Sequence, residues 1–82
     1  MTFGKNLRRE RNKLGLTVED VAKNCGISRS YITLIENGKR APGKKILAKI
    51  ALALKVKTVI VLDWYLDGLR EELQKTSPFQ IS

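Results

Sequence analysis

Hydrophobic residues recur at helical spacing along most of the chain. Phe3, Leu7 and Leu14 follow this spacing and predict an amphipathic helix over residues 2–13, which Gly15 suits as a C-terminal cap. In the next segment the same spacing predicts a buried row formed by Val18, Val21, Ala22 and Cys25. Each row needs an apolar surface to pack against, so we expect the two segments to share one core.

Polar residues and glycines indicate where the next helices begin and end. Thr17 is a good N-cap for the second helix, with Asp20 three residues later as the other half of a capping box. Gly26 ends this helix, and Ser28 caps a third helix that ends near Asn37. Because only three residues separate the two helices, and one of them is glycine, the sequence predicts a helix-turn-helix.

A fourth helix is expected to open at Pro42, because proline is favoured in the first turn of a helix. Its core row is formed by Ile46, Leu47, Ile50, Ala51 and Leu54. Beyond it the chain is apolar on nearly every side, and the pattern favours a helix over 58–67, a cap at Gly68 and a short helix over 69–75. One continuous helix, or a short strand within the β-branched residues 56–61, is the alternative.

These elements predict one small all-α domain of 82 residues. Residues 1–57 contain the helix-turn-helix, and residues 58–82 form a helical extension that completes the same compact core. The two parts differ in charge: the first holds fourteen Lys and Arg against four Asp and Glu, the second two against four. The first part therefore suits a polyanion such as nucleic acid, unless its bases only form a solvated face.

Two charged residues fall near the predicted apolar faces. Arg11 lies close to the row of the first helix, and Glu36 comes four residues after the apolar Ile32. A charge beside a core normally needs a partner, so we expect Arg11 and Glu36 to form an ion pair that ties the first helix to the end of the third. The alternative is that both side chains reach out to water.

The chain offers little for catalysis or for holding a metal. It has no histidine, one cysteine (Cys25), no Gly-rich phosphate loop and no Cys or His metal spacing. We therefore expect no enzymatic activity, no cofactor and no metal. With a single cysteine, no signal core and no apolar run of membrane length, the sequence predicts a cytoplasmic protein that forms no disulfide and does not bind a membrane.

Three stretches occur in the order typical of one family: LGLT before the second helix, GIS in the turn and IENGKRAP at the end of the third. Through them residues 4–56 resemble the helix-turn-helix domain of the lambda-repressor-like Cro/Xre family. The resemblance implies a five-helix DNA-binding domain that acts as a dimeric transcriptional repressor on a near-palindromic operator, and it also implies the Arg11–Glu36 pair. Val18 departs from the family, whose members often carry a glutamine there that contacts the DNA.

By this resemblance the third helix reads the major groove. Its nearly uncharged outer face suits base edges, because excess charge there would bind phosphates without discrimination. The residues expected to read bases are Arg29, Ser30, Thr33 and Leu34, although Leu34 could instead shield Tyr31 or simply be exposed. Phosphate contacts are expected from Thr17, Tyr31, Asn37, Lys39, Arg40 and Lys44, although Tyr31 could instead cover the contact between the second and third helices. Lys5, Arg8 and Arg9 are expected to add only a general positive field.

The C-terminal extension carries more apolar surface than one small core needs. We expect it to form a homodimer interface through Leu62, Trp64, Tyr65, Leu66, Leu69 and Leu73. Alternatively, Trp64 and Leu66 complete the monomer core. Phe79 and Ile81 in the last six residues are candidates for docking on a partner. The competing function is an antitoxin- or antirepressor-type interaction module whose C-terminal segment binds another protein.

Overall fold

Five helices make up residues 2–76, the part of the chain that the computed structural model describes. They are α1 (Thr2–Lys13), α2 (Val18–Cys25), α3 (Arg29–Glu36), α4 (Lys44–Leu54) and α5 (Thr58–Thr76). No strand occurs among these residues, so the all-α prediction is confirmed. Residues 1 and 77–82 lie outside the described part, and with them the expectation for Phe79 and Ile81.

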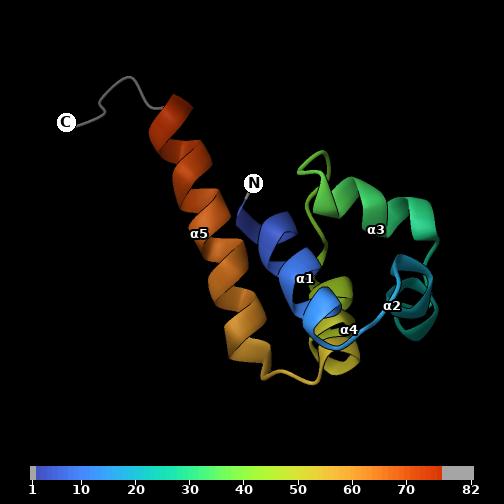
Figure 1. The fold of residues 1–82 in the computed structure, drawn as a ribbon. Helices are drawn as coiled ribbons and strands as arrows, with labels where there is room; N and C mark the ends of the chain where they lie inside the picture. Colours follow the sequence, from blue (N-terminus) through green and yellow to red (C-terminus); the bar gives the residue numbers. More distant parts are fainter. Residues whose placement is uncertain (1, 77–82) are drawn as a thin grey trace.

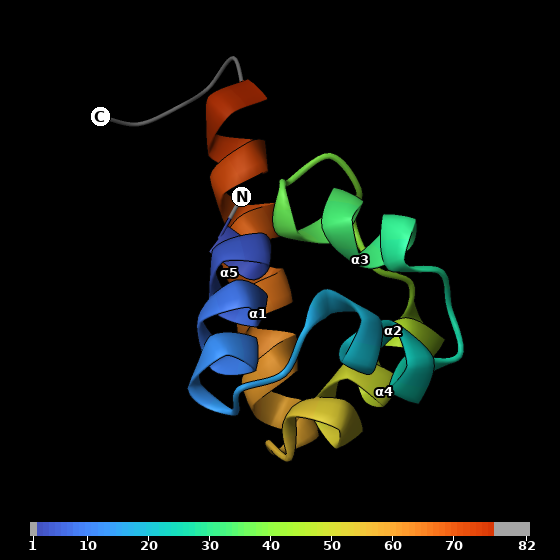
Figure 2. The ribbon, with the colours of Figure 1, turned by 45° about the vertical axis from the view of Figure 1, so that its right-hand side comes forward.

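The helices are arranged around α1, which packs against α5 on one side and α3 on the other (Figure 1). α2 packs against both α3 and α4, and α4 packs in turn against α5. A second view places α2 and α3 on one side of the molecule and α5 on the opposite side (Figure 2). The helix-turn-helix and the long C-terminal helix are therefore separated by α1.

Every helix contributes to one hydrophobic core. Its fully buried side chains include one from each helix, in chain order Leu7, Val21, Ile32, Ile50 and Val61. Burying an aliphatic side chain of this size stabilises a fold by about 1.5–3 kcal/mol. Between α1 and α5 the core is closed by Phe3 and Trp64, whose rings meet edge to face with their centroids 5.9 Å apart.

The predicted caps of the helix-turn-helix are confirmed. The hydroxyl of Thr17 accepts a hydrogen bond from the backbone N–H of Asp20, and the carboxylate of Asp20 accepts one from the backbone N–H of Thr17. Gly26 ends α2 in the left-handed region with a φ of 67°, which glycine adopts without strain. Ser28 then accepts a hydrogen bond from the backbone N–H of Tyr31 and starts α3.

α1 approaches the end of α3 so closely that only glycine fits at position 4. A Cβ atom on Gly4 would overlap the backbone carbonyl oxygens of Ile35 and Glu36. This close approach brings Arg8 and Arg11 of α1 within reach of the Glu36 carboxylate. The missing side chain at Gly4 is therefore part of what positions α3.

Two expectations about the first and fourth helices are wrong. α4 begins at Lys44 with Gly43 as its N-cap, and Pro42 is buried in the segment before it. The φ of proline suits an extended segment as well as a first helical turn, so the residue alone does not fix the boundary. Leu14 follows the last residue of α1 and is 45% exposed, because the chain turns away from the core at that point.

α5 is one uninterrupted helix of 19 residues, so the predicted split at Gly68 is wrong and the continuous alternative is right. The strand considered for residues 56–61 does not form. Glycine disfavours a helix interior by only about 1 kcal/mol, and the packing of α5 against α1 and α4 outweighs that penalty. Within residues 2–76 no helix combines the length and the apolar character that crossing a bilayer requires.

Candidate nucleic-acid interface

α3 has one face in the core and one face in solvent. Ile32 and Ile35 are at most 1% exposed and pack the inner face of the helix into the core. All four residues expected to read bases are exposed on it: Arg29, Ser30, Thr33 and Leu34. Their exposure is what a groove-reading helix requires. Their contacts with bases stay a prediction.

Arg29 lies at the very start of α3, beside the first turn of α2. Its Nη1 atom is 3.1 Å from Oε1 of Glu19, and the two side chains are 69% and 67% exposed. The sequence pattern assigns no role to Glu19, because nothing in its spacing connects it to Arg29. The crossing of α2 and α3 alone brings the two residues together.

Tyr31 and Arg40 form a second contact at this surface. The guanidinium carbon of Arg40 lies 4.7 Å above the centroid of the Tyr31 ring, within the range of a cation–π interaction. Tyr31 is half-buried and packs against the core. Tyr31 therefore packs against the core and also contacts Arg40 in the segment that follows α3.

A nearly buried carboxylate ties α1 to the end of α3. The side chain of Glu36 is 3% exposed and accepts hydrogen bonds from Arg11 Nε at 2.7 Å and from Arg11 Nη2 at 3.1 Å. The expected ion pair is thus present, with both oxygens engaged, and the alternative in which both groups reach water does not occur. Arg11 also donates to the carbonyl oxygen of Leu16 at 2.9 Å. Hydrogen bonding to Glu36 raises the pKa of Arg11.

Arg8 contributes more than the general field expected of it. Its Nε donates to Glu36 at 3.2 Å, and its Nη2 donates to the side-chain oxygen of Asn37 at 3.0 Å. Asn37 is the C-cap of α3 and opens the basic segment that follows. Because Arg8 lies three residues before Arg11 on α1, helical spacing alone would have placed both on one face.

The other residues expected at phosphates are exposed: Thr17, Asn37, Lys39, Arg40 and Lys44. Thr17 uses its hydroxyl oxygen as an acceptor in the capping box. Hydrogen bonds from Thr17, first from its backbone and then from its side chain, lower the pKa of Asp20. The Asp20 carboxylate therefore stays ionised to a lower pH than an ordinary aspartate does.

On α5 the predicted interface residues separate into two sets. Leu62, Leu66, Leu69 and Leu73 are 39–60% exposed and follow one another along the helix. Trp64 is 8% exposed and packs on Phe3, so its place in an exposed interface is corrected: its ring belongs to the monomer core. Leu66 does not join that core, since 43% of it is exposed.

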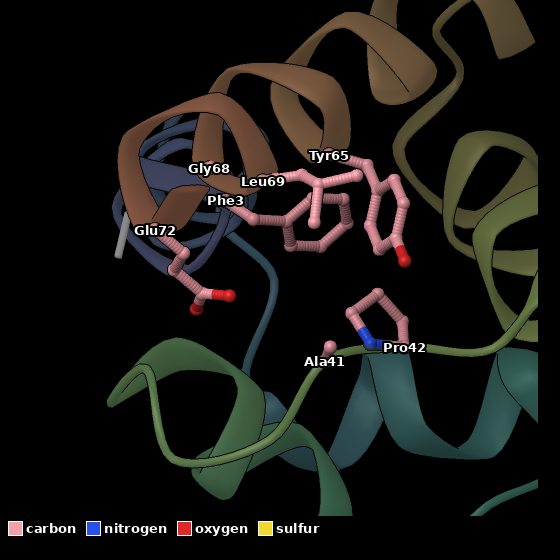
Figure 3. A pocket seen from close by; sticks show the side chains of 7 residues that line it. All are labelled: Phe3, Ala41, Pro42, Tyr65, Gly68, Leu69 and Glu72. Carbon is pink, nitrogen blue, oxygen red and sulfur yellow. The ribbon is translucent and has the colours of Figure 1, made fainter. Parts of the chain in front are cut away.

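Tyr65 and Leu69 border a small pocket (Figure 3). Its lining comes from the start of α1, the segment before α4 and the middle of α5: Phe3, Ala41, Pro42, Tyr65, Gly68, Leu69 and Glu72. The volume of about 40 Å³ suits water molecules rather than a drug-sized ligand.

No group of three His, Cys, Asp or Glu side chains among the described residues is placed to hold a metal. Cys25 is buried, and burial raises the pKa of its thiol, in agreement with a role in the core.

Known proteins are similar to this chain in sequence. A model of a helix-turn-helix family matches residues 7–61. An uncharacterized HTH-type transcriptional regulator of Bacillus subtilis, RghRB, is 36% identical over 78 residues, which are 92% of this chain and 56% of that protein. The HTH-type transcriptional repressor RghR of the same organism is 43% identical over 56 residues, 67% of this chain and 42% of that protein. The chain thus spans about half the length of these two relatives.

Two solved structures are similar over most of their length. The restriction-modification controller protein C.AhdI of Aeromonas hydrophila has a TM-score of 0.70 and 33% identity, covering 73% of this chain and 91% of that chain. The clp gene regulator ClgR of Corynebacterium glutamicum has a TM-score of 0.70 and 25% identity, covering 90% and 84% of the two chains. These similarities confirm the predicted fold.

Proposed function

This chain belongs to the lambda-repressor-like Cro/Xre family of helix-turn-helix transcriptional regulators, and we propose that it is a homodimeric repressor of a near-palindromic operator in double-stranded DNA. The observation that carries the proposal is the outer face of α3. That face exposes Ser30, Thr33, Leu34 and one arginine, Arg29, while Ile32 and Ile35 fix the helix to the core.

Base discrimination comes from α3 lying in the major groove. Arg29 donates to O6 and N7 of a guanine, a contact worth about 1–3 kcal/mol of discrimination. Ser30 and Thr33 make adaptable hydrogen bonds, and Leu34 contacts a thymine methyl group. Residues 1–57 hold all of these groups.

Affinity comes from the cations and donors around α3. Thr17, Tyr31, Asn37, Lys39, Arg40 and Lys44 contact phosphates on either side of the groove. Arg40 is held by the Tyr31 ring, and Asn37 by Arg8, so these two anchors are oriented before DNA binds. Oriented anchors lose less conformational freedom on binding.

Dimerisation uses the exposed row on α5. Leu62, Leu66, Leu69 and Leu73 leave a large apolar surface in water if the chain stays monomeric. Pairing two copies through this row buries it and lets two α3 helices reach half-sites about one turn of DNA apart, ~34 Å. The same row would serve an antitoxin- or antirepressor-type module if its partner were a different protein, so the partner's identity has to be measured.

Selection of bound sequences from a random duplex pool tests the proposal. We expect enrichment of an inverted repeat whose half-sites are about 10–10.5 base pairs apart from centre to centre. Failure to bind any duplex at low ionic strength would overturn it. Sedimentation of the purified chain at micromolar concentration should give the mass of a dimer. A stable monomer that copurifies with a second chain would instead support the interaction module.

A further inference from the structure

We infer that Glu19 is a positioning residue for base recognition: its carboxylate holds the Arg29 guanidinium so that the arginine engages a guanine rather than a phosphate. The inference deepens the proposed function and rests on it. No part of the family resemblance assigns a role to this position, and the pair is visible only in the folded chain, where α2 meets α3.

The atoms in contact leave the base-reading edge of the arginine available. Glu19 Oε1 faces Nη1 of Arg29 at 3.1 Å. In a guanidinium the Nε and Nη2 groups present two parallel N–H bonds along another edge, the edge that Arg11 uses for Glu36. The spacing of those two N–H bonds matches O6 and N7 of guanine. Glu19 therefore restrains the plane of the Arg29 guanidinium without occupying the groups that the base needs.

The negative charge of Glu19 also favours contact of Arg29 with a base over contact with a phosphate. Arg29 is 69% exposed at the start of its helix, and an unrestrained arginine there would bind any nearby phosphate. Glu19 adds a negative charge beside it, which repels phosphates but leaves the neutral base edge unaffected. The carboxylate thus lowers affinity for DNA of arbitrary sequence more than it lowers affinity for the operator.

The test compares Glu19→Gln with Glu10→Gln in the full chain. Both variants remove one negative charge, but Glu10 lies on α1 and pairs with Arg9 and Lys13, away from α3. Binding is measured on the selected operator, on operators with the guanine opposite Arg29 replaced, and on an unrelated duplex. We expect Glu19→Gln to lower the preference for guanine about two- to fivefold and to strengthen binding to the unrelated duplex. Glu10→Gln should leave the guanine preference unchanged.

A double-mutant cycle establishes that Glu19 acts through Arg29. In the Arg29→Ala background, Glu19→Gln should no longer change base preference at that position. An unchanged preference in the single Glu19→Gln variant, or an equal loss with Arg29 absent, would overturn the inference. Either result leaves the proposed function intact if the unsubstituted chain still selects its operator. Loss of selection by the unsubstituted chain would instead refute the proposed function itself.

Discussion

α3 and α5 both lie at the outside of the bundle, and both expose leucine, yet their exposed surfaces suit different partners. α3 has eight residues, is capped at both ends and exposes one arginine, two hydroxyl side chains and one leucine. α5 has nineteen residues and exposes a row of leucines along its length. A helix that meets base edges must offer hydrogen bonds, whereas a helix that meets another protein gains most from apolar surface.

The charge of the surroundings follows the same division. Around α3 the chain is strongly basic, whereas residues 58–82 hold four acids and two bases. Acidic groups near a DNA backbone weaken binding, and a dense basic field around an apolar interface opposes the pairing of identical chains. Separating the two surfaces with α1 lets each have the charge that its proposed partner requires.

The largest effect is expected where α3 is tied to α1. Glu36→Ala leaves Arg11, whose side chain is only 13% exposed, without its carboxylate. We expect the free energy of unfolding to fall by about 3 kcal/mol, measured by urea denaturation. Glu10→Ala, which removes the ion-pair partner of the exposed Arg9 on the same helix, is the control and should change the midpoint little. Equal midpoints for both variants would mean that the Glu36 pairs do not stabilise the fold.

A substitution on α5 should separate association from base recognition. Leu66→Asp places a charge in the middle of the leucine row, and we expect dimer dissociation to become about 30-fold or more easier, ~2 kcal/mol, by sedimentation. Leu52→Asp is the matched control, because Leu52 is 80% exposed on α4, outside the row. Binding to an isolated half-site should be the same for both variants. A dimer unaffected by Leu66→Asp would remove α5 from the interface.

Within the proposed DNA surface, bases and phosphates should respond differently. Arg29→Ala should relax the preference at one position of each half-site by about 1–3 kcal/mol. Lys39→Ala should weaken binding to all sequences alike and reduce the slope of log affinity against log salt by about one. Quantitative binding at several salt concentrations gives both quantities. The same uniform loss in the two variants would contradict the division between α3 and its flanking cations.

Most of the helix-turn-helix could be predicted from the sequence because its signals are local. The caps at Thr17 and Ser28 depend on hydrogen bonds between residues three apart. The Arg11–Glu36 pair could be predicted for a different reason: each charge interrupts an apolar row, and burial forces it to find a partner. The predicted interruption of α5 at Gly68 is wrong because tertiary packing overrides the low helix propensity of glycine.

The exposed contacts of the candidate interface could not be predicted in this way. The pairing of Glu19 with Arg29, and that of Arg40 with Tyr31, depend on how two elements cross, and no burial penalty forces them to form. Arg8 could be predicted in part. Helical spacing places it beside Arg11, but its hydrogen bond to Asn37 depends on where α3 ends in the folded chain. Exposed polar contacts are therefore where the structure adds most to the sequence.

The smallest effect is expected at the cap of α2, and it depends on pH. Hydrogen bonds from Thr17 lower the pKa of Asp20 below its ordinary value of 3.8. The folded state thus binds this proton less readily than the unfolded state, so the stabilisation is complete above pH 3.8 and is lost as the pH falls through the lowered pKa. Asp20→Asn keeps an oxygen acceptor but cannot titrate. In urea unfolding, wild type should exceed this variant in stability at pH 6, and the difference should vanish toward pH 2. Association through α5 should be the same in both proteins at pH 6, because Asp20 lies on α2. A difference in unfolding free energy that stays constant with pH would show that the charge of Asp20 does not stabilise the cap.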